Sequence, residues 1–101
     1  MASKRFYDMI RESATSVAEL LVEKNEAYGD SINVAPEIMK ILYPNGIPPE
    51  KLDDSLTIVR ILDKLCRIAR GDESAFGESP WKDITGYALL QWIKKRLQGK
   101  E

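Results

Sequence analysis

The sequence contains no histidine and a single cysteine, Cys66. Without histidine, the chain lacks the commonest general base, the Ser-His-Asp and Cys-His nucleophile arrangements and histidine metal sites. One cysteine excludes a disulfide within the chain, and its place among apolar residues predicts a buried thiol in a reducing compartment. No apolar run reaches the roughly 18 residues of a membrane span, and none resembles a signal peptide. We therefore expect a cytoplasmic protein with no membrane partner.

The net charge is only −1, because the chain has 15 basic and 16 acidic residues. Such a balance gives no general attraction to nucleic acid, so we expect no duplex nucleic acid partner, and any basic site must be a local patch. Hydrophobic residues make up 44% of the chain and charged residues 31%, which is typical of a folded protein. The length of 101 residues predicts a single domain over residues 1–101.

Apolar residues recur at helical spacing in four segments, and no segment alternates as a strand does. The expected helices are residues 5–27, 32–43, 52–70 and 81–97. Glycine and proline separate them, and Ser79-Pro80 pairs an N-cap serine with a proline at the first helical position. The pattern predicts an all-α fold, a small bundle of three long helices and one short helix.

The segment 52–70 is apolar around most of its circumference, which predicts a central helix buried by the other helices. The last helix also carries apolar residues on more than one face. So much apolar surface in a short chain predicts a symmetric dimer or tetramer. Gly86 lies in the middle of that last helix, where glycine costs about 1 kcal/mol relative to alanine. We expect another helix or a ligand to approach it closely.

A polar stripe remains on the central helix, formed by Arg60, Asp63, Lys64 and Arg67 at three- and four-residue steps. Two interpretations are open. The stripe forms structural ion pairs, including pairs with glutamates of the first helix, or its cations hold a phosphate. In the second case, tyrosines stack on a base and Asp30 or Asp83 contacts a base edge or ribose. The predicted ligand-binding residues are Tyr28, Asp30, Arg60, Lys64, Arg67, Asp83 and Tyr87.

Carboxylates raise a catalytic alternative. Glu23 and Glu26 are three residues apart and project from one helical face. With Asp63 and Asp83 they would offer four carboxylates to Mg²⁺, which prefers oxygen ligands and a substrate phosphate.

Three motifs taken together are more specific. They are Lys24-Asn25-x-x-Tyr28-Gly29-Asp30, Asp63-Lys64-x-x-Arg67 and Asp83-x-x-Gly86-Tyr87. In this order, over about residues 19–92, the chain resembles the nucleotide modification associated domain family of phages and bacteria. The resemblance implies a role on or around nucleotides. The chain is also distantly similar to the all-α nucleoside triphosphate pyrophosphatases of the MazG type. Those enzymes hold Mg²⁺ with E-x-x-E and E-x-x-D carboxylates and assemble as dimers or tetramers.

The chain departs from that catalytic pattern. Glu23-x-x-Glu26 matches its first half, but Arg60-x-x-Asp63 stands in place of E-x-x-D, with Lys64 beside it. Cations there oppose metal binding and favour direct contact with phosphate. Our leading hypothesis is a phage-type protein, in the host cytoplasm, with no catalytic residue and no cofactor. It would sequester a small phosphorylated nucleotide, linear or cyclic, for example a host defence signal. Two alternatives remain.

The first alternative is a divergent Mg²⁺-dependent nucleoside triphosphate pyrophosphatase with Glu23, Glu26, Asp63 and Asp83 on the metal. The second is a structural or protein-binding helical module. In that case Phe76, Trp81 and Trp92 would be the anchors for a partner.

Overall fold

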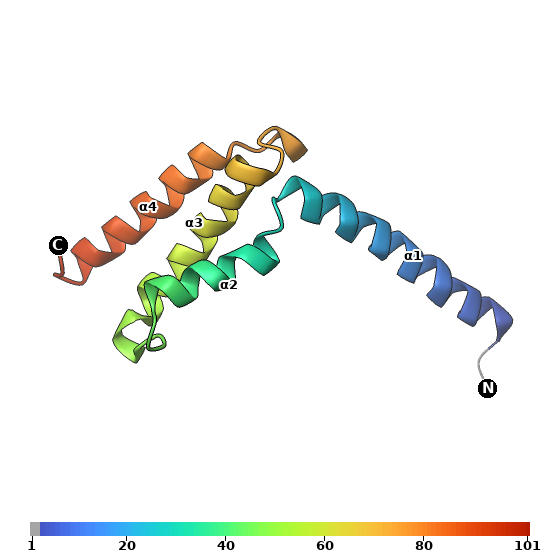
Figure 1. The fold of residues 1–101 in the computed structure, drawn as a ribbon, viewed down its shortest axis with the longest axis horizontal. Coiled ribbons are helices and arrows are strands. Elements are labelled where there is room, and N and C mark those ends of the chain that lie inside the picture. Colours follow the sequence, from blue (N-terminus) through green and yellow to red (C-terminus); the bar gives the residue numbers. More distant parts are fainter. Residues whose placement is uncertain (1–2) are drawn as a thin grey trace.

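The computed structural model describes residues 3–101, which form four α-helices and two short 3₁₀ turns (Figure 1). The elements are α1 (Lys4–Ala27), α2 (Ser31–Leu42), η1 (Pro49–Lys51), α3 (Leu52–Arg70), η2 (Ala75–Gly77) and α4 (Pro80–Leu97). No strand occurs among these described residues. The all-α prediction, with three long helices and one short one, is confirmed, and each helix end lies within one residue of the expected position. Met1 and Ala2, part of the predicted domain, lie outside the described residues.

Local sequence explains where the last two helices begin. Pro49 opens the 3₁₀ turn that leads into α3, and Pro80 is the first residue of α4. The Ser79 hydroxyl accepts a hydrogen bond from the Lys82 backbone N–H at 3.3 Å, so Ser79 is the N-cap that the sequence predicts.

Two helices, α2 and α4, pack on α3, whereas α1 projects away from them (Figure 1). The molecule is accordingly elongated, with extents of 60 × 34 × 27 Å. The predicted bundle is therefore incomplete within one chain: three helices pack together, and the first one lies apart.

Polar side chains join α3 to α4 along one edge. The Thr57 hydroxyl lies 2.8 Å from Gln91 Oε1, and Gln91 Nε2 donates to Asp54 at 3.1 Å. Asp54 in turn pairs with Lys95 at 2.8 Å, and Asp53 with Lys94 at 2.5 Å. These contacts explain why Gln91 interrupts the apolar surface of α4.

The core of one chain is small. Its buried hydrophobic residues are Ala35, Leu62 and Cys66. The thiol is buried as predicted, and burial raises its pKa. The expectation that α3 is covered on nearly all sides is wrong for a single chain, because Leu56 is 59% exposed and Leu65 41% exposed. These two leucines are nine residues apart and lie on opposite sides of α3, so the helices packed on it leave more than one of its sides exposed.

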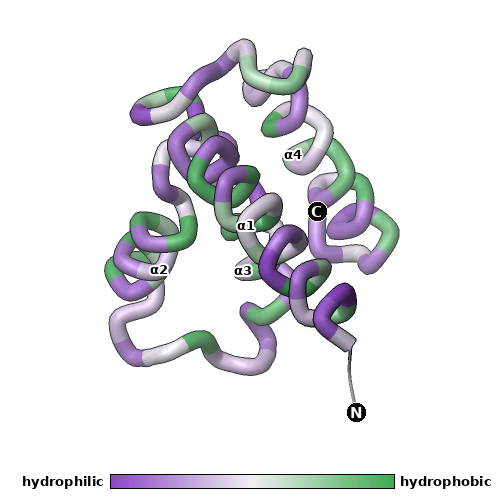
Figure 2. The backbone as a smooth tube through the Cα atoms, turned by 90° about the vertical axis from the view of Figure 1, so that its right-hand side faces the viewer, coloured by the Kyte–Doolittle hydropathy of each residue, from purple (hydrophilic) through white to green (hydrophobic). Residues whose placement is uncertain are grey.

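Helix α1 has no buried residue. Hydrophilic and hydrophobic residues recur along it (Figure 2), as in an amphipathic helix. Phe6, Ile10, Val17 and Leu21 lie on one side of it and are each at least half exposed. Among residues 3–101, no helix combines the length and the hydropathy that a membrane span requires. This structure differs from a closed helical bundle mainly because no other helix packs on the apolar side of α1.

Candidate functional site

The turn between α1 and α2 packs tightly onto α3. Gly29 adopts φ +68°, and a Cβ at this position would overlap with the backbone carbonyl of Cys66. Asp30, also left-handed at φ 57°, accepts hydrogen bonds from Asn25 at 3.0 Å and Asn33 at 2.8 Å. This geometry gives the Asn25, Gly29 and Asp30 of the first motif a structural role. The turn brings Tyr28 beside α3.

Asp30 makes this turn sensitive to acid. The hydrogen bonds from Asn25 and then Asn33 favour its charged form and lower its pKa. A carboxyl whose pKa is lowered by folding stabilises the fold above its unfolded pKa, and this contribution is lost as the pH falls below about 4. We expect the free energy of unfolding to fall less steeply with acid in Asp30→Asn than in wild type. Urea unfolding between neutral pH and about pH 3 measures both slopes, and parallel curves would contradict this role.

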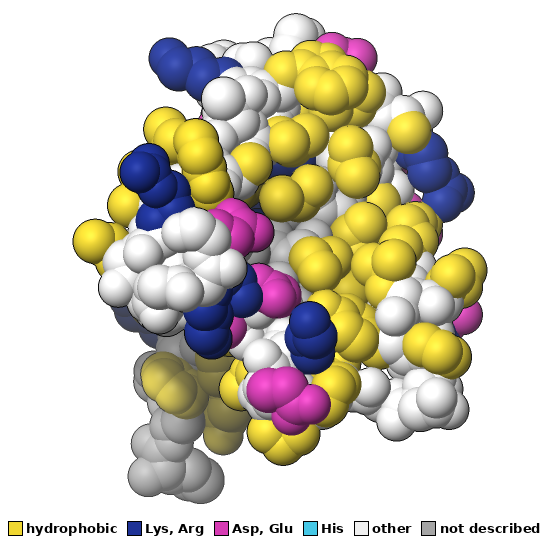
Figure 3. Space-filling model, turned by 90° about the vertical axis from the view of Figure 1, so that its left-hand side faces the viewer, with side chains coloured by type: hydrophobic (Ala, Val, Ile, Leu, Met, Phe, Trp, Pro, Cys, Tyr) yellow, Lys and Arg dark blue, Asp and Glu magenta, His cyan; other side chains and the backbone are white. Residues whose placement is uncertain are grey.

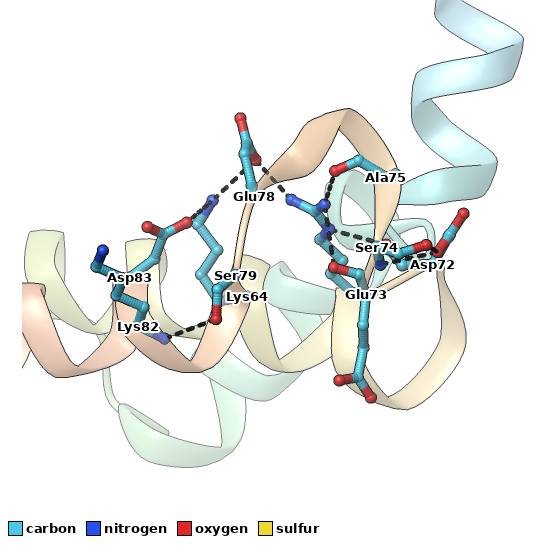
Figure 4. A network of polar contacts seen from close by, with 10 residues as sticks. Lys64, Asp72, Glu73, Ser74, Ala75, Glu78, Ser79, Lys82 and Asp83 are labelled. Carbon is cyan, nitrogen blue, oxygen red and sulfur yellow. Dashed lines mark hydrogen bonds and ion pairs between the residues drawn. The ribbon is translucent and has the colours of Figure 1, made fainter.

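Arg67 fixes the path of the loop between α3 and α4, whose residues are labelled in Figure 4. Its side chain is 1% exposed. The guanidinium donates to the backbone carbonyls of Asp72, Glu73 and Ala75 and pairs with the Glu78 carboxylate at 2.5 Å. Most of its donors are therefore engaged within the chain. Arg67 has a structural role in addition to the phosphate contact predicted for it.

Lys64 ties the start of α4 to α3 (Figure 4). Its ammonium lies 3.0 Å from Asp83 and 3.8 Å from Glu78. Burial alone would lower the pKa of Lys64, but the hydrogen bond to Asp83 and the charges of Asp83 and Glu78 together outweigh it and raise the pKa. Lys64 is therefore charged at neutral pH, and its charge is compensated by two carboxylates.

These elements surround a hollow of about 220 Å³. It is lined by Tyr28, Ser31, Arg60, Asp63, Lys64, Arg67, Glu78 and Tyr87. Five of the seven predicted ligand-binding residues therefore meet there, although they come from three separate segments. The Arg60 guanidinium lies 5.7 Å from the centre of the Tyr87 ring, and the Arg67 guanidinium 5.4 Å from that of Tyr28. The hollow thus combines cations with two aromatic rings.

Two predicted residues do not line the hollow. Asp30 is held by asparagines in the turn, and Asp83 pairs with Lys64 but is not part of the lining. Conversely, Ser31 and Glu78 line it and were not predicted. Glu78 lies in a polar loop without periodicity, so nothing in the sequence distinguished it from its acidic neighbours. Glu78 reaches the hollow because Arg67 fixes the path of the loop that carries it.

The four carboxylates proposed for Mg²⁺ do not meet within one chain. Glu23 and Glu26 line a different hollow, beside Arg70 and Phe76. Asp83 is paired with Lys64. Among residues 3–101, no three acidic or thiol side chains are grouped as metal ligands. The residues present in one chain therefore do not fit the metal site that the distant similarity implies.

No family model, no curated protein and no solved structure matches this chain. The resemblance to the nucleotide modification associated domain family stays a prediction, carried by its three motifs.

Proposed function

We propose that the hollow binds a small phosphorylated nucleotide and that the protein sequesters this ligand without transforming it. The observation that carries the proposal is the convergence of Tyr28, Arg60, Lys64 and Tyr87 on one hollow. Arg60 and Lys64 would contact phosphate, and the tyrosine rings would stack on the base or support the ribose. Arg67 would hold the rim of the site through the loop.

Arg60 is the cation best placed to meet a phosphate. Within the described chain, no carboxylate lies within ion-pair distance of it. Lys64, by contrast, is already paired with Asp83 and Glu78, so a phosphate must compete with these carboxylates for it. The affinity should therefore depend more on Arg60 than on Lys64.

The size of the hollow bears on how the ligand would be held. A volume of about 220 Å³ is below the range of roughly 300–1,000 Å³ usual for sites that enclose a whole ligand. One chain would therefore cover only part of a nucleotide. We propose that the protein is a homo-oligomer, a dimer or tetramer, and that a neighbouring subunit covers the rest.

Native mass spectrometry tests this function directly. The protein would be measured alone and after incubation with pooled linear and cyclic nucleotides and Mg²⁺. An intact nucleotide retained by the oligomer would support sequestration, including that of a host defence signal by a phage protein. Conversion of the pool to monophosphates and pyrophosphate would contradict it and favour the pyrophosphatase alternative.

We expect Arg60→Ala to weaken binding of the retained nucleotide at least tenfold, since a hydrogen bond to a charged group contributes about 1.5–3 kcal/mol. Arg60 is exposed, so the fold should be unaffected. Lys40→Ala is the matched control, because Lys40 is an exposed cation on α2 paired with Glu37. Titration calorimetry of both variants decides the assignment, and equal affinities for Arg60→Ala and wild type would refute it.

A protein-binding role is the second candidate, favoured by three exposed aromatic residues. Phe76 is 48% exposed, Trp81 57% and Trp92 52%. Large exposed aromatics are common anchors of protein interfaces. Failure of every nucleotide in a thermal-shift panel would favour this role over nucleotide binding.

A further inference from the structure

An apolar groove runs over α3 between α2 and α4. Its volume is about 730 Å³. The apolar side chains that line it are Leu42, Tyr43, Ile58, Ile61, Ala88 and Trp92. Figure 3 views the molecule from the side opposite α1, and hydrophobic side chains cover much of that face. Three helices packed side by side with an apolar groove between them lack the fourth helix of a bundle.

The missing element has a counterpart in α1. Its apolar side is exposed along its whole length, and no residue of the helix is buried. Its C-terminal end is held beside the C-terminal end of α3, where the Asp72 N–H donates to the Ala27 carbonyl at 2.8 Å. From there it projects away from the end of the molecule that holds the C-terminus (Figure 1). The groove, which includes Lys100 and Glu101, is therefore not covered by the α1 of its own chain.

The exposed area indicates that this surface is covered by another chain. A compact monomer of this size exposes about 5,800 Å², whereas this chain exposes 7761 Å². The excess of roughly 2,000 Å² exceeds the roughly 800 Å² that each partner buries in an interface of standard size. The radius of gyration, 18.6 Å, likewise exceeds the value of about 13 Å expected for a compact chain of this length.

We propose that α1 is an exchanged arm: the α1 of a second copy lies in the groove between α2 and α4, and the two copies exchange these helices reciprocally. This proposal specifies the self-association proposed above and does not depend on nucleotide binding. Reciprocal exchange makes the interface symmetric and closed, so it stops at a defined assembly.

The length of α1 agrees with this occupant. The 24 residues of α1 span about 36 Å, and the 19 residues of α3 along the groove about 28 Å. The arm is therefore long enough to cover the groove along the whole of α3. Glu12 and Glu19 lie on the side of α1 opposite Val17, so burial of the apolar side leaves these charges at the surface.

Light scattering of the full-length protein and two variants tests the exchange. Val17→Asp places a charge in the middle of the apolar side of α1, whereas Thr15→Asp places the same charge on its polar side, a matched control. We expect wild type and Thr15→Asp to be dimers or larger and Val17→Asp to shift to monomer at the same concentration. An oligomer that survives Val17→Asp would overturn the exchange alone, and a monomeric wild type would overturn both the exchange and self-association.

Cross-linking locates the arm independently of whether Val17→Asp folds. One preparation carries Val17→Cys, near the middle of α1, and the other Ala88→Cys, near the middle of α4. Both sites are central, so they meet whether the arm runs parallel or antiparallel to α4. After mixing and subunit exchange, a short bismaleimide should link the two variants to each other. Links that form mainly between two Val17→Cys chains would place arm against arm and overturn the proposal.

Discussion

We expect Gly29→Ala to destabilise the protein by about 2–4 kcal/mol, a large share of the roughly 5–15 kcal/mol that holds a typical domain folded. Two effects add. A side chain at φ +68° strains the backbone by about 1 kcal/mol or more. The new Cβ would also overlap with the Cys66 carbonyl, which belongs to the backbone of α3 and cannot rotate away. Overpacking of this kind adds about 1–3 kcal/mol.

Gly46 provides the control that separates these effects. It has φ +88°, but a Cβ there would meet nothing within 4 Å. Gly46→Ala should therefore cost only the strain, about 1 kcal/mol. Urea unfolding of both variants at one protein concentration gives the two losses. Equal losses would show that the contact between Gly29 and the Cys66 carbonyl does not limit the size of the side chain at this position.

Replacement of Arg67 should have the second-largest effect. We expect Arg67→Met to lower the free energy of unfolding by about 3 kcal/mol, because it leaves a buried site without the donors that hold three loop carbonyls and Glu78. Arg67→Lys should recover little, since an ammonium lacks the planar fork that reaches several acceptors at once.

Arg70→Met is the matched control for Arg67→Met. Arg70 is exposed at the end of the same helix, so its loss should change the stability by less than about 0.5 kcal/mol. Limited proteolysis reports the mechanism, because a loop released from Arg67 should be cut between residues 72 and 79. Cleavage elsewhere, with that loop still protected, would assign the stability loss to another cause.

The helices of this protein follow from its sequence alone. Their hydrogen bonds join residues four apart, so apolar periodicity together with the Ser79-Pro80 start marks them without any tertiary information. For the same reason, Arg60, Lys64 and Arg67 share one face of α3 regardless of how the rest of the chain folds. Helical spacing is what allowed the α3 side of the candidate hollow to be predicted.

The partners of those side chains were decided by the tertiary structure. Lys64 meets Asp83 across two helices, and Arg67 meets the carbonyls of a loop whose course has no periodic signal. Glu23 and Glu26 were expected near Asp63 because these carboxylates together would suit Mg²⁺, but the direction in which α1 leaves its turn separates them. That direction depends on the contact of Gly29 with Cys66, residues 37 positions apart. Contacts over such distances in the chain depend on packing, and packing is not encoded in the spacing of any one segment.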